Sequence, residues 1–209
     1  MVTNFKRLSL LQNALAEEVI DKDMPYQSIN NICGVDVSYK KNKSFCSAVI
    51  IKKDSFEMVE SVNTEDDITA SYVPGYFVLR EFTPIIKTLK LLKNSFDILL
   101  IDGHGRLHPR ECGLACFIGL FFNKTTVGVA KSLLCGKVLE NDYVEYNDKI
   151  LGYKLSKNNK NVYVSVGHKI SLITAVDISK LLIKSNEWQP EPLRLADLNS
   201  KNCSKCITI

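Results

Sequence analysis

The sequence predicts an α/β fold in which a mixed central sheet is flanked by helices on both faces. Strand-like segments come first, and helical and strand-like segments alternate later in the chain. One strand-like run, Phe96–Ile101, is apolar throughout. A strand without polar positions is typical of a sheet that is covered on both faces. Early strands followed by alternating helices and strands therefore indicate a mixed sheet between two helical layers.

The first part of the chain is expected to begin with a helix and to continue as strands. Apolar residues recur at helical spacing over Phe5–Ile20. The segments Ile32–Tyr39, Phe45–Lys52 and Ser55–Val62 are rich in β-branched and aromatic residues. We expect these three segments to form an antiparallel meander. A polar linker, Asn63–Ala70, follows them.

Proline and glycine mark the boundaries in the middle of the chain. Pro74 and Gly75 predict a turn within Ser71–Tyr76. The next helix is expected to begin at Glu81 or Pro84 and to end at Asn94. The later elements are expected to include a buried helix over Gly113–Phe122, a short strand over Thr125–Val129 and a closing helix over Ser171–Lys184. Before the closing helix, Val138–Val166 is expected to hold two or three β segments, with a polar hairpin turn at Lys154–Asn161.

The composition excludes several classes of protein. Of the 209 residues, 45% are hydrophobic and 24% are charged, which is ordinary for a globular protein and too apolar for disorder. The longest apolar run, Leu114–Phe122, is far shorter than the roughly 20 residues of a membrane span. The N-terminal segment has charges on both sides of a short apolar stretch, unlike a signal peptide. We expect a cytoplasmic protein with one domain over residues 1–200 and a tail at 201–209.

Charge and cysteine content narrow the expected partners and compartment. The formal net charge of +4 allows a nucleic-acid partner but does not argue for one. Seven cysteines, an odd number, favour a reducing compartment over a disulfide framework. Cys203 and Cys206 form a single CxxC, whereas a zinc site usually needs a second pair of ligands. A frayed tail, a terminal disulfide and a metal-scavenging pair remain open for this motif.

Three carboxylates have unusual contexts. Asp36 lies within the first apolar strand, Asp102 follows the apolar run, and Glu81 stands near a helix start. A buried carboxylate is costly unless it is paired or bound to a metal, and open α/β sheets bind ligands at the carboxyl ends of their strands. Each residue also has an ordinary interpretation. Asp36 suits an outward strand position, Asp102 suits a turn, and Glu81 suits the first turn of a helix.

The loop at residues 102–110 combines two glycines with two histidines and two arginines. Carboxylates that hold Mg²⁺ or Mn²⁺, next to basic groups that steady a phosphate, suit a metal-assisted phosphodiester reaction. The histidines are equally typical of a polar loop, and a zinc site formed by His104, His108 and Cys112 is a less favoured alternative. Lys131 follows an expected strand, where it suits either phosphate binding or an ordinary surface position.

Specific blocks extend over nearly the whole chain, from about Cys33 to Ala196. They are Gly34–Tyr39, Tyr72–Gly75, Leu79–Glu81, Asp102–Gly105, His108–Arg110, Gly113–Ala115, Gly128–Ser132, Gly167–His168 and Pro190–Ala196. In this order and spacing they resemble the endonuclease V family, which comprises inosine-directed nucleases with a ribonuclease H-like fold. The resemblance therefore implies a ribonuclease H-like mixed sheet and an endonuclease activity.

The resemblance also implies roles for individual residues. Asp36, Glu81 and Asp102 match the family's metal ligands, which implies Mg²⁺ as the cofactor and Mn²⁺ as a substitute. The further residues implied for the catalytic site are His108, Lys131 near the scissile phosphate, and His168. Tyr72, Val73 and Pro74 match the wedge that fills the gap left by an extruded base. The glycines whose backbone is implied to accommodate hypoxanthine are Gly75, Gly103, Gly105, Gly113 and Gly128.

Three features depart from the family pattern. Ser71 stands where the wedge usually begins with proline, and His104 stands where glutamine is common. The CxxC has no counterpart in the pattern. None of these departures involves the implied metal ligands. Ser71 suits a more flexible wedge loop, and His104 is a candidate modulator of metal choice or pH dependence.

The implied reaction is hydrolysis of the second phosphodiester bond 3′ of inosine, which leaves 3′-hydroxyl and 5′-phosphate ends. We expect a monomer, and its implied partner is inosine-containing DNA in DNA repair. An endoribonuclease acting mainly on inosine in RNA is the alternative. Two rival interpretations remain. One is a ribonuclease H-like enzyme that cuts junctions or RNA–DNA hybrids, and the other is a non-catalytic nucleic-acid-binding module.

Overall fold

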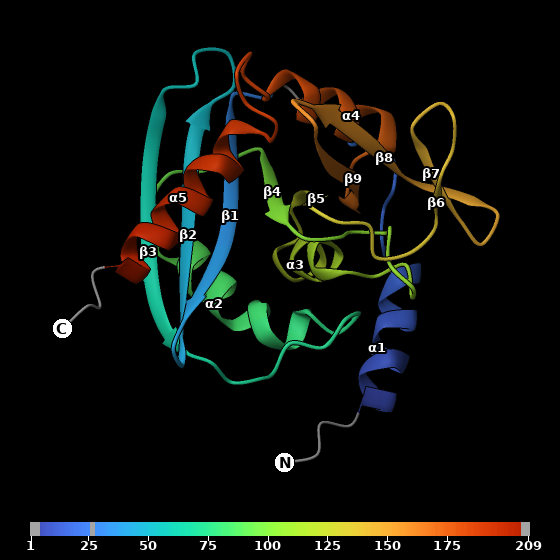
Figure 1. The fold of residues 1–209 in the computed structure, drawn as a ribbon, viewed down its shortest axis with the longest axis horizontal. Coiled ribbons are helices and arrows are strands. Elements are labelled where there is room, and N and C mark those ends of the chain that lie inside the picture. Colours follow the sequence, from blue (N-terminus) through green and yellow to red (C-terminus); the bar gives the residue numbers. More distant parts are fainter. Residues whose placement is uncertain (1–4, 26–27, 206–209) are drawn as a thin grey trace.

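The computed structural model describes residues 5–25 and 28–205. Within these residues, nine strands form one mixed sheet in the order β3-β2-β1-β4-β5-β9-β8-β7-β6. The β1–β4 and β4–β5 pairs are parallel, and the other neighbouring strands are antiparallel. Helix α5 crosses one face of β1 and β2, and α2 lies behind the same strands (Figure 1). The predicted mixed sheet with helices on both faces is confirmed.

The elements follow one another in an order close to the predicted one. The strands are β1 (Asn31–Lys40), β2 (Lys43–Lys52), β3 (Met58–Asp67), β4 (Ile98–Asp102), β5 (Thr125–Ala130), β6 (Lys137–Val138), β7 (Tyr143–Tyr146), β8 (Lys149–Lys157) and β9 (Lys160–His168). The helices are α1 (Phe5–Glu17), α2 (Val78–Lys90), α3 (Leu114–Phe122), α4 (Leu172–Leu181) and α5 (Glu191–Lys205).

Two large apolar layers, one on each face of the sheet, form most of the interior, and Leu107, Val144 and Leu151 form a smaller third cluster. In β4, Ile98 and Leu100 belong to the layer beneath α4 and α5, whereas Leu99 and Ile101 belong to the layer beneath α2 and α3. All four side chains are fully buried. Alternate residues of a strand point to opposite faces, so a strand between two apolar layers has no polar position. The continuous apolar run in the sequence has this cause.

Two boundaries differ from the prediction. The expected linker Asn63–Ala70 is wrong over residues 63–67, because β3 continues to Asp67 and pairs there with Lys43 of β2. This edge strand is half exposed, so its polar residues carry no apolar signal. Helix α2 begins at Val78, earlier than expected, with Pro84 inside it.

Helix α5 is the element that periodicity did not predict. It packs on β1, where a Cβ at Gly34 would come within 2.4 Å of the backbone of Pro192. Glycine therefore permits the close approach of the helix to the strand. The helix runs across residue 200 and includes Cys203, whereas Cys206 lies outside the described residues. Among the described residues, none of the helices is both long enough and apolar enough to cross a bilayer.

Candidate active site

Sheet register brings Asp36 and Asp102 together. On the parallel strands β1 and β4, Val35 pairs with Ile101, so the two aspartates follow at the next position of the ladder. Asp36 lies two residues after Gly34, whose Cα faces α5, and therefore points to the same face of the sheet. Strand pairing therefore places these two carboxylates next to each other at the end of the buried strand.

A third carboxylate, Asp197, reaches this position from α5. One carboxylate oxygen from each of Asp36, Asp102 and Asp197 lies within 4.8 Å of the other two. Ser200, one helical turn further along α5, is buried and donates a hydrogen bond of 2.9 Å to Asp36 Oδ2. Sequence reasoning missed Asp197. The available signal was its place directly after the Pro190–Ala196 block.

The ammonium group of Lys131 lies among the three aspartates. Its Nζ is 2.6 Å from Asp102 Oδ2, 3.0 Å from Asp197 Oδ1 and 3.9 Å from Asp36 Oδ1. Val129 pairs with Asp102, so Lys131, two residues later, extends from the same face of the sheet. Burial disfavours its charge, but the carboxylates outweigh this effect and raise the pKa of Lys131. Burial and the neighbouring Asp102 raise the pKa of Asp36.

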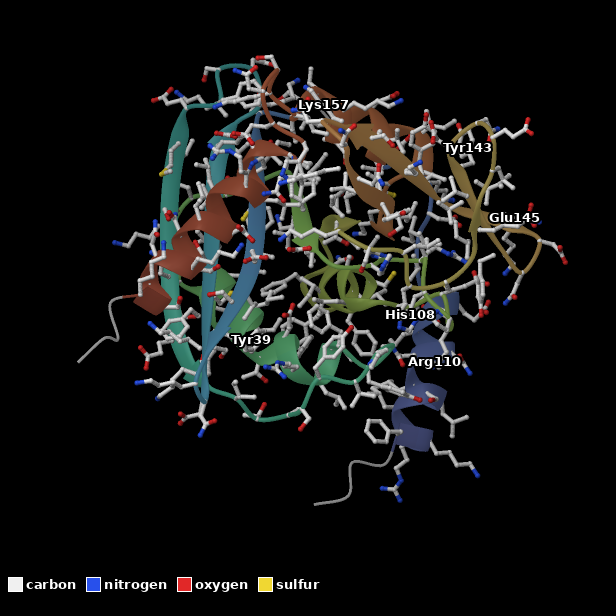
Figure 2. The ribbon with its side chains drawn as sticks, in the orientation of Figure 1. Tyr39, His108, Arg110, Tyr143, Glu145 and Lys157 are labelled. Carbon is white, nitrogen blue, oxygen red and sulfur yellow. The ribbon has the colours of Figure 1, made fainter. Side chains whose placement is uncertain are left out.

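Glu81 lies in the same cavity but outside the group of three aspartates. It belongs to α2, on the opposite face of the sheet from α5, and burial raises its pKa. Tyr39, at the end of β1, donates a hydrogen bond of 2.9 Å to Glu81 Oε1, and Arg80 covers the ring of Tyr39 at 3.9 Å. Figure 2 shows Tyr39 beside α2. The role of Glu81 as a metal ligand stays a prediction.

A cavity of about 390 Å³ is lined by Asp36, Glu81 and Asp102, whereas Asp197 does not line it. The predicted wedge forms part of its lining through Tyr72 and Pro74, whereas Val73 does not line it. The side chain of Tyr72 is 58% exposed, and its ring meets that of Phe77 edge-on with centroids 5.6 Å apart. An exposed aromatic ring at the edge of a cavity is suited to stacking against a nucleic-acid base.

Gly75, which directly follows the predicted wedge, is held through its carbonyl oxygen. His108 Nε2 donates to this oxygen at 3.1 Å, Gln12 donates at 3.4 Å, and the Arg110 guanidinium also donates. His108 Nδ1 accepts a hydrogen bond from the Arg110 backbone. Burial and Arg110 lower the pKa of His108 to about 4, so the ring is neutral at pH 7. His108 and Arg110 lie beside α1 (Figure 2), and His108 positions the wedge through Gly75.

The glycines predicted to form the base pocket have two different positions. Gly75, Gly103 and Gly113 line the cavity, whereas Gly105 and Gly128 do not. A Cβ at Gly105 would lie 1.9 Å from the carbonyl oxygen of Val166, and one at Gly128 would lie 2.4 Å from Gly105 N. These two glycines therefore allow the loop after β4 to pack against neighbouring strands.

The two other histidines differ in position: His104 lines the cavity near Asp102, whereas His168 lies away from the carboxylates. His168 does not line the cavity, and its Nδ1 accepts a hydrogen bond from the Ile20 backbone. It pairs with Thr126, at the other end of β5 from Lys131. His104 Nε2 donates to the Ser132 carbonyl. Among the described residues, the three aspartates are the one group whose ligand atoms converge, so the zinc alternative is not supported.

The donor chemistry of the three aspartates suits a hard divalent cation. Carboxylate oxygens are the ligands that Mg²⁺ and Mn²⁺ prefer. Two unit negative charges at about 4 Å repel each other by on the order of 4 kcal/mol at the effective dielectric of a protein surface. A cluster of three aspartates therefore needs a cation, and this group could hold a metal ion.

Carboxylates that meet on neighbouring central strands of a ribonuclease H-like sheet, beside a cavity with an exposed aromatic side chain, define a nuclease of this fold class. A profile of the Endonuclease V family matches residues 13–198, and the chain belongs to that family. The chain is therefore an endonuclease. Family membership decides against the rival of a junction- or hybrid-cutting enzyme from another family.

Individual relatives extend this result. The chain is 41% identical over 201 residues to Endonuclease V of Thermofilum pendens, which covers 93% of this chain and 87% of that protein. Identity to the Thermococcus kodakarensis protein is 36% over 197 residues, with coverage of 94% and 91%.

Solved structures agree in fold. The structure of Ciona intestinalis Endonuclease V has a TM-score of 0.87 and 27% identity, and the match covers 98% of this chain and 99% of that one. That protein was solved with a 24mer DNA that contains an inosine followed by a ribo-adenosine. Human ENDOV matches with a TM-score of 0.84 and 28% identity, over 96% of this chain and 98% of that one.

Proposed function

We propose that the protein recognises inosine in nucleic acid and hydrolyses the second phosphodiester bond 3′ of it, leaving 3′-hydroxyl and 5′-phosphate ends. One observation carries this proposal. Asp36 and Asp102, two of the three converging aspartates, line the same cavity as the exposed Tyr72. A site that cuts the backbone next to a side chain that can replace a base is the arrangement that a lesion-directed nuclease needs.

In the proposed reaction, Asp36, Asp102 and Asp197 hold Mg²⁺, for which Mn²⁺ substitutes, and Glu81 completes the site from the other face of the sheet. When bound, the metal would polarise the phosphodiester and activate the attacking water. Ser200 fixes the orientation of the Asp36 carboxylate through its hydrogen bond. Lys131 lines the cavity and supplies a positive charge for the scissile phosphate.

In the proposed recognition step, Tyr72 enters the strand in place of the extruded base, together with Val73 and Pro74. Flipping a base costs a few kcal/mol, and less where the base is mismatched. The backbone of Gly75, Gly103 and Gly113 faces the cavity that would accept hypoxanthine. Adenine carries an amino group where hypoxanthine carries an oxygen, so a backbone N–H at this position would reject adenine by leaving two donors face to face.

The proposed substrate is DNA, and the proposed role is repair of deaminated adenine. The protein would act as a monomer in the cytoplasm, with residues 1–200 as one catalytic domain. An endoribonuclease that acts on inosine in RNA is the second candidate. The observation that favours it is the relative bound to DNA in which a ribonucleotide follows the inosine. A cavity that accepts an extruded base from a single strand suits either polymer.

A cleavage assay tests the proposal. End-labelled DNA and RNA oligonucleotides with one inosine, beside adenosine controls, are incubated with Mg²⁺ and then with Mn²⁺. Asp36→Asn serves as the blank, and Asp54→Asn, in the exposed turn between β2 and β3, serves as the matched control. We expect a metal-dependent nick one nucleotide beyond the inosine from the parent and from Asp54→Asn, but none from Asp36→Asn.

The ratio of DNA to RNA cleavage assigns the physiological substrate. A rate on RNA well above the rate on DNA would favour the endoribonuclease. A folded protein that nicks neither polymer at inosine would overturn the proposed activity and favour the non-catalytic binding module.

A further inference from the structure

Lys131 lies among the three aspartates that could hold a metal ion. Its Nζ makes close contacts with Asp102 and Asp197, at 2.6 and 3.0 Å, and lies 3.9 Å from Asp36. Those carboxylates are the group whose oxygens lie close enough to share one cation. The lysine therefore neutralises part of the negative charge that the metal would otherwise neutralise.

We propose that Lys131 is an exchangeable internal counter-ion of the metal site. Its ammonium group holds the aspartates together without metal, and a divalent cation must displace it in order to bind. This inference rests on the proposed function, because it takes the three aspartates as the metal ligands. The new element is that metal binding releases Lys131 toward the phosphate of the substrate.

Exclusion of one cation by the other follows from the distances. Mg²⁺ binds carboxylate oxygens at about 2.0–2.1 Å, so an ion shared by these carboxylates would fill the space that Nζ now holds. Two cations in direct contact also repel each other. Metal and ammonium therefore compete for the same oxygens, and the competition weakens metal binding.

The lysine has a route out of the cluster. Lys131 follows the last residue of β5, its side chain is 38% exposed, and it lines the cavity above the aspartates. A lysine has a flexible four-carbon stem, so its charged end can move without a change in the backbone. Displacement toward the cavity would bring Nζ to the side from which a phosphodiester approaches.

Lys201 offers a matched control for Lys131. It contacts the other oxygen of Asp197, Oδ2, at 2.7 Å, and its side chain is 57% exposed. It therefore pairs with the same aspartate from outside and, within residues 5–25 and 28–205, forms no ion pair with Asp36 or Asp102. Its removal changes the charge of the chain as much as removal of Lys131 does, but it leaves the centre of the cluster unchanged.

The first test measures metal binding alone. Metal-stripped parent, Lys131→Met and Lys201→Met proteins are titrated with Mg²⁺ and Mn²⁺ by isothermal titration calorimetry. We expect Lys131→Met to bind Mg²⁺ about tenfold more tightly than the parent, because a close competing charge is removed. The Mg²⁺ affinity of Lys201→Met should stay near that of the parent. Equal or weaker binding by Lys131→Met would overturn the proposal.

The uncompensated aspartates could prevent Lys131→Met from folding without metal. A second test therefore uses the parent protein, without any substitution. Lysine acylation of the parent protein is followed by peptide mass spectrometry while Mg²⁺ is added, with Lys201 as the internal reference. We expect acylation of Lys131 to rise severalfold relative to Lys201. Unchanged or reduced acylation, in protein that binds Mg²⁺, would overturn the counter-ion proposal and leave the proposed function intact. A parent protein without any Mg²⁺ binding would refute both.

Discussion

The carboxylate cluster and the wedge loop border the same cavity but are built differently. Asp36 is 6% exposed and is held by a strand, with Asp102 on the next strand and Asp197 on α5 against them. Tyr72 is 58% exposed and lies in a segment without regular structure. Reacting groups need to be held within a fraction of an ångström, whereas a group that replaces a base must adapt to its substrate. Under the proposed function, this difference separates the groups for chemistry from those for recognition.

The two regions are connected at Gly75. Its carbonyl accepts hydrogen bonds from His108 and Arg110 of the loop that follows β4, the strand that ends in Asp102. The wedge is thus exposed at Tyr72 and anchored three residues later. Changes in the cluster, at the tip of the wedge and at the anchor should therefore have separable effects.

The largest effect is expected in the cluster. We expect Asp102→Asn to reduce cleavage by about a thousandfold or more, because loss of a metal ligand removes several kcal/mol of transition-state stabilisation. The rate is measured on an inosine oligonucleotide with Mg²⁺, and circular dichroism checks the fold. Asp54→Asn should cleave like the parent. Substantial cutting by purified Asp102→Asn would refute its assignment to the metal site.

A smaller and different effect is expected at the tip of the wedge. Tyr72→Ala should reduce the preference for inosine over adenosine by about tenfold or more, because base–aromatic stacking contributes about 1–3 kcal/mol. Mg²⁺ affinity, measured by calorimetry, should stay at the parent value. Equal discrimination by variant and parent on matched oligonucleotides would count against the wedge assignment. A matching loss of metal affinity would remove the separation of the two regions.

The smallest effect is expected at the anchor, and it concerns stability. Burial lowers the pKa of His108 from 6.5 to about 4, so between these values the unfolded chain binds a proton that the folded protein does not. Stability should therefore be complete above pH 6.5 and should fall as the pH decreases toward 4. His104 also has a pKa lowered to about 4 and contributes in the same direction.

Urea denaturation of the parent and of His108→Gln between pH 7.5 and 4.5 tests this expectation. The variant should lose less stability over that range than the parent, because the His108 contribution is removed while those of His104 and His168 stay. Carboxylates that titrate near pH 4 are common to both proteins and cancel in the comparison. An unchanged pH dependence would show that His108 is not a buried neutral group.

Most of the fold could be predicted from local patterns. Helical spacing indicated α1, and the run Phe96–Ile101 indicated a strand buried on both faces, because these signals come from neighbours along the chain. The end of β3 could not be predicted, since its polar residues form a strand only through pairing with β2. Helix α5 was missed for a related reason: the short stripe that it buries includes the polar residues Glu191 and Ser200, and most of its other residues are polar.

The sequence by itself determined the residue types of the site. Asp36, Asp102 and Lys131 stand in recognisable blocks, and their types suit metal and phosphate. Only the tertiary structure decided which groups meet. Strand register joins Asp36 to Asp102, and the packing of α5 adds Asp197. Glu81 stays outside that group because α2, which carries it, covers the opposite face of the sheet. The face of a sheet on which a helix packs is not specified by the linear sequence.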